Sequence, residues 1–201
     1  MHPVLKQETA QFHRRLNSLA NIRVLVKPEL TAPQYLKVLS AFAGAYSLME
    51  RTLIPLDRSL KLGALRAYAP RLPALMEDIS SLGGHPPRDR PPQARPGRPA
   101  AIPPIAAETM PHYLGLRYVL DGTSQGGKYI VQRLRKNAPQ LIGRAFAFWT
   151  VQEEAAAQWP LLCERITQIS EGAEARQQML AAAKSAYGVF IECCGLPAQD
   201  A

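Results

Sequence analysis

Residues 118–130 read YVLDGTSQGGKYI. Whether this segment forms a helix or a phosphate-binding loop decides between an all-helical fold and a nucleotide-binding α/β fold. Its Gly-Gly-Lys matches part of a P-loop, but Tyr129 follows where that motif has Ser or Thr, and no strand precedes it. We therefore expect a helix with interior glycines at Gly122, Gly126 and Gly127. Each costs a helix about 1 kcal/mol relative to alanine. Either a flat ligand or a tightly packed neighbouring helix approaches this backbone, or the helix kinks there.

The remainder of the chain also has helical spacing. Thr31 is a good N-cap with Pro33 just behind it, and an apolar stripe then recurs every three or four residues to Leu53. We expect Pro55 to end that helix. Further helices are predicted over 72–82, where two glycines follow, and over 105–120, 124–136, 152–169 and 174–194. Strand patterns are scarce. The prediction is an all-α single domain over residues 1–201 with about eight helices.

One segment departs from this pattern. Eight of the 18 prolines lie in residues 86–104, together with four arginines. Because proline fixes φ and lacks the amide donor, we expect an extended Pro/Arg-rich loop or linker there.

Composition limits the function classes. The chain has 201 residues, 47% of them hydrophobic, three cysteines and a net charge of +8. It has no secretory start and no apolar run near the roughly 20 residues of a membrane helix, so we expect a cytoplasmic protein that does not contact membrane. By itself the charge would suit nucleic acid, an anionic membrane surface, an acidic protein partner or an anionic small molecule. No recognition helix supports nucleic-acid binding.

A second segment with candidate functional residues is TAQFHRRLNSL, residues 9–19. On a helix, His13 has Asn17 one turn later and Lys6 two turns earlier on the same face. A histidine beside an apolar face is often purely structural. As a metal ligand, its second ring nitrogen could be held by Asn17.

These segments resemble the heme oxygenase family, in the family's order. TAQFHRRLNSL resembles the helix with the proximal histidine, and YLKVLSAFAGAYSLMERTL the aromatic-rich second helix. YLGLRYVLDGTSQGG resembles the distal glycine-rich helix in its bacterial, biliverdin-producing form. RAFAFWT and QMLAAAKSAYGVFIECC resemble the following Phe-rich turn and the last helix. The proline-rich loop lies outside the resemblance.

The resemblance implies roles for residues on these segments. His13 would bind heme iron, with His112 as the rival ligand, and Lys6 would pair with a propionate. Asn17 would support the imidazole. The other expected heme-binding residues are Gly122, Gly126, Gly127, Phe148 and, at the propionate edge, Arg117 with the weaker candidates Tyr113 and Tyr187. Gly122, Thr123 and Ser124 would form the catalytic distal pocket and its water network.

Three positions depart from the mammalian pattern. Thr123 stands where mammalian enzymes have an acidic residue, and Asn17 stands where they have Glu. The propionate-pairing Arg and Lys before the last helix have poor matches around residues 159–163. The proximal and distal surroundings of the heme are therefore expected to be neutral.

The implied activity is O2-dependent opening of heme at a meso carbon to biliverdin, ferrous iron and carbon monoxide, with heme as substrate and cofactor. Electrons would come from an acidic ferredoxin, flavodoxin or flavoprotein reductase that docks on basic residues beside the two heme helices. The candidates are Arg14, Arg15, Lys128, Arg133, Arg135 and Lys136. Biliverdin could pass to an acceptor such as a bacteriophytochrome. A monomer is expected. The alternative is a non-catalytic heme-binding or interaction protein of the same fold.

Overall fold

The computed structural model describes residues 2–85 and 109–195, so the Pro/Arg-rich loop lies outside the described residues. Within these ranges the chain is helical and contains no strand. The α-helices, two of them single turns, are α1 (His2–Ser18), α2 (Ala20–Arg23), α3 (Ala32–Ser59), α4 (Leu72–Ser81), α5 (Met110–Asn137), α6 (Pro139–Ile142), α7 (Ala147–Ala155), α8 (Trp159–Ile169) and α9 (Ala173–Gly195). Two 3-10 turns, η1 (Val24–Val26) and η2 (Ala156–Gln158), join them. The expected all-α bundle of about eight helices is confirmed.

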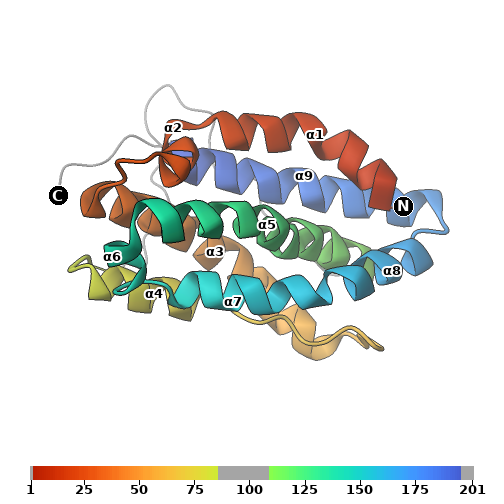
Figure 1. Ribbon diagram of the computed structural model, residues 1–201. Coiled ribbons are helices and arrows are strands. Elements are labelled where there is room, and N and C mark those ends of the chain that lie inside the picture. Colours follow the sequence, from red (N-terminus) through yellow and green to blue (C-terminus); the bar gives the residue numbers. More distant parts are fainter. Residues whose placement is uncertain (1, 86–108, 196–201) are drawn as a thin grey trace, which may run out of the picture.

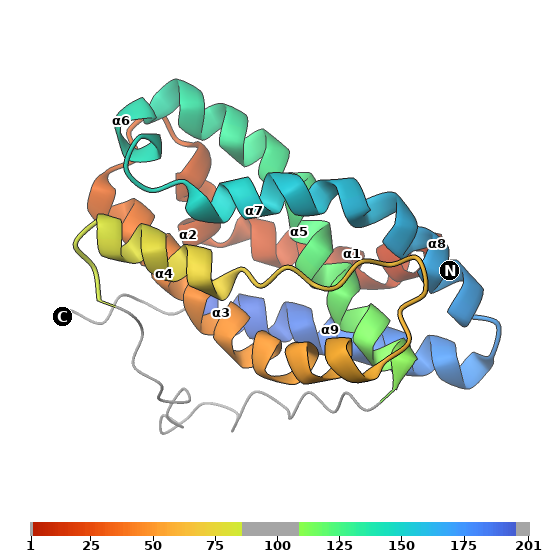
Figure 2. The ribbon, with the colours of Figure 1, turned by 90° about the horizontal axis from the view of Figure 1, so that it is seen from below.

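The helices pack around α5, which lies in the middle of the bundle (Figure 1). It contacts α9 most extensively, and α1 also packs against α9. α7 and α8 follow one another along one side of α5 in both views (Figures 1 and 2). α1 and α5 are therefore both held against α9 without packing closely on each other, and this spacing creates the site described below.

The crossing of α5 and α9 depends on Gly115. A Cβ there would collide with the Met179 carbonyl oxygen and would lie 2.8 Å from the Ala182 Cβ. The two backbones approach more closely than side chains allow, so only glycine fits this position.

Two of the predicted helix boundaries are confirmed. Thr31 caps α3 and forms a capping box with Gln34. The backbone N–H of Gln34 donates to the Thr31 hydroxyl. At the end of α4, Gly83 adopts a φ of 79°, and the Gly84 amide donates to the Ile79 carbonyl at 2.9 Å. This is the left-handed glycine stop that the sequence predicts.

Three boundaries were predicted wrongly. α3 continues through Pro55 to Ser59, because Asp57 beyond it accepts a hydrogen bond from the Tyr68 amide and anchors the last turn. α5 is one continuous helix from Met110 to Asn137, held by α7, α8 and α9 around it. The predicted helix over 152–169 breaks into α7 and α8, and Pro160 starts the second of them.

Candidate functional site

A cavity of about 540 Å³ lies between α1 and α5, within the usual range for a small-molecule site. α3 and α9 line it from the interior, while α7 and the start of α8 close it on the side of α5. Eight of the predicted site residues line it: Lys6, His13, Asn17, Gly122, Thr123, Gly126, Phe148 and the weaker candidate Tyr187. Residues more than 100 positions apart in the chain therefore meet at one cavity.

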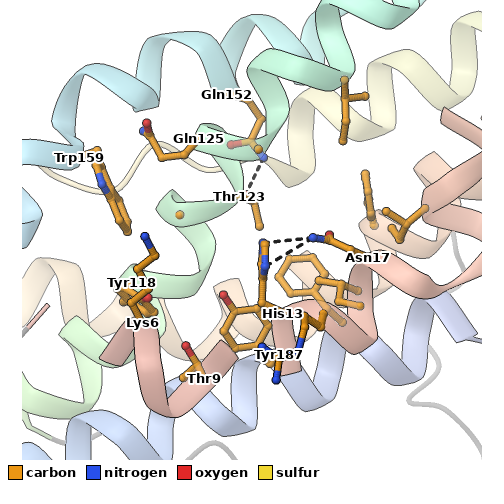
Figure 3. Close-up of a pocket in the computed structure, with 18 of the residues that line it drawn as sticks. Lys6, Thr9, His13, Asn17, Tyr118, Thr123, Gln125, Gln152, Trp159 and Tyr187 are labelled. Atoms are coloured by element: carbon orange, nitrogen blue, oxygen red, sulfur yellow. Dashed lines mark hydrogen bonds between the residues drawn. The ribbon is translucent and has the colours of Figure 1, made fainter. Parts of the chain in front are cut away.

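His13 projects from α1 toward Thr123 on α5 (Figure 3). Burial lowers the pKa of its imidazole from the ordinary 6.5, which favours the neutral ring that a metal ion requires. The Asn17 amide nitrogen lies 3.4 Å from each ring nitrogen. The Tyr187 ring stands edge-on to the imidazole, with 6.4 Å between the centroids. His112 is absent from the cavity lining and hydrogen-bonds Thr109 instead.

Opposite His13, the wall formed by α5 contains two glycines, Gly122 and Gly126, beside the side chains of Tyr118, Thr123, Gln125 and Ile130. A Cβ at Gly126 would meet no atom within 4 Å, and one at Gly122 would lie 3.4 Å from the Trp159 ring. At Gly126 no neighbouring helix packs on α5, whereas at Gly122 the Trp159 ring at the start of α8 lies within contact distance. Of the alternatives that the sequence left open, a ligand site therefore fits Gly122 and Gly126 better than tight helix packing does.

Gly127 serves a different purpose. A Cβ there would lie 3.6 Å from the Trp149 ring, and Gly127 does not line the cavity. Gly127 was expected to contact heme, but its face of α5 packs on Trp149 of α7. Ser124 also points away, since its buried hydroxyl donates to the Asp121 carbonyl at 2.5 Å.

Arg117 was expected at the propionate edge, but its side chain is buried in the interior of the bundle. Its guanidinium is 2% exposed and binds the Asp121 carboxylate at 2.6 Å, and Arg71 binds the other oxygen of that carboxylate at 2.6 Å. Arg117 also donates to the Tyr113 hydroxyl, and Tyr113 in turn donates to Asp57. Neither Arg117 nor Tyr113 lines the cavity, because buried carboxylates hold both.

Two residues that sequence reasoning missed form a polar group with Thr123 on the cavity wall. The Tyr46 and Thr123 hydroxyls lie 3.0 Å apart, and the Gln152 amide nitrogen lies 3.0 Å from the first and 2.9 Å from the second. Burial raises the pKa of Tyr46 to about 12, so the phenol keeps its proton. In the sequence, Tyr46 was only one member of an apolar stripe, and Gln152 was only a position on a predicted amphipathic helix.

Aromatic rings complete the walls. Phe148 packs on Tyr46 and Trp149, with centroids 5.8 and 4.9 Å apart. Trp159 stacks obliquely on Tyr118 at 5.6 Å where α8 begins. The cations among the described lining residues are Lys6 and Arg14, and no described lining residue is acidic.

These features define a helical protein with a cavity between two helices, which has an imidazole on one wall and two glycines on the other. The heme oxygenase family matches residues 2–194 of the chain. A heme oxygenase of Xanthomonas campestris pv. campestris (strain 8004) is 31% identical over 132 residues, or 66% of this chain and 72% of that relative.

The solved structure of heme oxygenase from Leptospira interrogans has the same fold, with a TM-score of 0.65 and 20% identity over 96% of this chain and 97% of that one. The chain belongs to the heme oxygenase family, an oxidoreductase family whose substrate is heme. None of these matches favours the non-catalytic alternative. No helix among the described residues is long and apolar enough to cross a membrane.

Proposed function

We propose that heme binds in the cavity between α1 and α5, with the His13 imidazole on the iron. One observation carries this assignment: an imidazole with a lowered pKa faces, across the cavity, the backbone at Gly126. A flat ring fits between these two walls, and a Cβ on either glycine would take up space next to it.

The cavity also suits the substrate's charges. Heme carries two anionic propionates, and Lys6 and Arg14 are the cations on the described lining. Both lie on α1 and are exposed, so they can pair with carboxylates at the cavity mouth. Trp159 offers an aromatic surface instead of a cation where α8 begins. We infer that α1 supplies the charged contacts that hold the propionates.

When heme is bound, its iron supplies the redox and oxygen chemistry that opens the ring. The protein's part is to orient the ring and to shape the oxygen side. Gly122 and Gly126 leave room there for a small molecule such as O2. Phe148 and Trp149 exclude bulk water behind them, and Thr123 adds a hydroxyl on a wall without acidic groups.

Catalysis also needs a reductant. The family requires a redox partner in general, and we propose an acidic ferredoxin, flavodoxin or reductase that supplies electrons for O2 activation. Six exposed basic residues flank the two cavity helices: Arg14, Arg15, Lys128, Arg133, Arg135 and Lys136. Arg135 pairs with Glu153 at 3.2 Å, which neutralises its charge, so the other five residues contribute more to the positive potential of this surface. Opposite charge on the partner would speed its association.

Spectroscopy tests the assignment. Purified protein is mixed with hemin, then given ascorbate or a ferredoxin–reductase system in air. Loss of the Soret band with growth of biliverdin absorption is the expected result. The His13→Ala variant should lose the spectrum of an imidazole-ligated iron, while His112→Ala, the matched control, should keep it. Normal ligation in His13→Ala would overturn the assignment of His13.

A further inference from the structure

The donor and the acceptor of each hydrogen bond among Tyr46, Thr123 and Gln152 can be assigned. These three residues lie on the side of the cavity where oxygen would bind. The Thr123 hydroxyl lies 2.7 Å from the Leu120 carbonyl oxygen, which can only accept, so Thr123 donates its single hydrogen there. The Tyr46 hydroxyl, 3.0 Å from Thr123, must then donate to the Thr123 oxygen. Both hydroxyl hydrogens are thereby used.

This order fixes the orientation of the Gln152 amide. Its atom nearest the two hydroxyls lies 3.0 Å from Tyr46 and 2.9 Å from Thr123, where no hydroxyl hydrogen remains to be shared. Only the NH2 end can make both contacts, because it brings two hydrogens of its own. The Gln152 carbonyl oxygen, Oε1, is consequently turned away from the group.

Oε1 of Gln152 is buried and has no hydrogen-bond donor among the described residues. The whole side chain is 2% exposed, yet it lines the cavity. A buried acceptor without a donor costs free energy, so natural structures supply one. Thr123 cannot help, since its oxygen already donates once and accepts twice.

We infer that Gln152 is a positioning residue that binds a water molecule through Oε1 on the oxygen side of the cavity. The water donates one hydrogen to Oε1, which leaves its second hydrogen for a small molecule bound at the iron. This inference rests on the proposed heme site. It assigns to a neutral amide the water-holding role that the sequence suggested for Thr123 and Ser124. Thr123 and Tyr46 are then the groups that hold the amide in place. Figure 3 shows the contact between Gln152 and Thr123.

Carbon monoxide is a suitable probe, because its stretching frequency falls when a donor approaches its oxygen. The ferrous heme complexes of the unaltered protein, Gln152→Leu and Gln125→Leu are saturated with carbon monoxide and compared by infrared spectroscopy in H2O and D2O. We expect an H2O/D2O shift in the unaltered protein, and a higher frequency without that shift in Gln152→Leu. Gln125 also lines the cavity, so Gln125→Leu is the matched control and should keep the shift.

A further measurement keeps the inference falsifiable if Gln152→Leu does not fold. A crystal structure of the unaltered heme complex should contain a water within about 2.7–3.2 Å of Gln152 Oε1. Heme binding without such a water, or an isotope shift that survives in Gln152→Leu, would overturn this inference alone. Absence of any Soret change with hemin would instead overturn the proposed function.

Discussion

The side-chain amide nitrogen of Asn17 lies 3.4 Å from both ring nitrogens of His13, one turn away on α1. The imidazole therefore has a neutral partner, whereas a carboxylate at this position would increase its basicity. We expect Asn17→Asp to raise the pKa of His13. NMR titration of the ligand-free protein measures it, with the His112 resonances as an internal reference. An unchanged His13 titration curve would show that the amide contact has no influence.

Heme binding should depend on pH through His13. Burial lowers the pKa of His13 below 6.5, and a metal binds only the neutral ring. We expect hemin affinity to persist as the pH falls through 6.5, and to drop only when the pH passes the lowered pKa. Soret titrations at a series of pH values measure this, and the corresponding drop should be missing in His13→Ala.

The same shift has a consequence for stability. The unfolded chain, with its ordinary histidine pKa, takes up the proton first as the pH falls, so the unfolded state binds more protons than the folded state. The contribution of His13 to the free energy of unfolding is therefore complete above 6.5 and decreases as the pH falls below it. Urea unfolding of the ligand-free protein across this range should show a smaller pH dependence in His13→Ala.

Substitution of Gly126 should separate stability from binding. A Cβ at Gly126 meets no protein atom, so Gly126→Ala should raise the free energy of unfolding by up to about 1 kcal/mol. The same methyl group enters the cavity, and we expect hemin affinity to fall by about tenfold, equivalent to about 1.4 kcal/mol. Gly188→Ala is the matched control on α9, where a Cβ also meets nothing but lies outside the cavity lining. It should stabilise the protein without weakening hemin, and equal affinities for the two variants would contradict our assignment of Gly126.

Asp121 should be essential for stability. It holds the buried guanidinium groups of Arg71 and Arg117 at 2.6 Å each, and both remain charged. Asp121→Ala leaves two buried cations without this partner, which should cost about 3–5 kcal/mol in urea unfolding. The exposed pair of Arg135 and Glu153 provides the comparison: Glu153→Ala should cost less than about 1 kcal/mol. A similar cost for the two variants would mean that the buried cluster is not a stabilising network.

Electron delivery should depend on salt. Reversing an exposed charge beside the cavity with Lys128→Glu should slow reduction by an acidic ferredoxin at low ionic strength, and high salt should remove most of the difference. Arg58→Glu, about three helical turns from the cavity residue Tyr46, should have little effect. Stopped-flow reduction of the hemin complex measures both. A salt-independent rate would count against electrostatic docking.

The sequence predicted those parts of the site that depend on local pattern. His13, Asn17 and Lys6 recur on one helix face, and the spacing of Gly122 and Gly126 puts both on one face of α5. These relations follow from helix geometry alone.

The remainder required tertiary information. Gln152 reaches Thr123 only because α7 packs beside α5, and no local rule relates positions 29 residues apart. Arg117 lies on α5, as Gly122 and Gly126 do, but its guanidinium pairs with the buried carboxylate of Asp121 instead of reaching the cavity. Pro55 failed as a helix stop because contacts of Asp57 outweigh the local preference of proline.

The close crossing at Gly115 has a further consequence for how the width of the cavity can change. There α5 rests on the α9 backbone with no side chain between them, so no larger residue fits at this position. At Gly126, in the other half of the same helix, a Cβ would meet no protein atom. The width of the cavity can therefore be changed by substitution at one end of α5 without disturbing the crossing at the other. Redesign for other tetrapyrroles should alter Gly126 and keep Gly115.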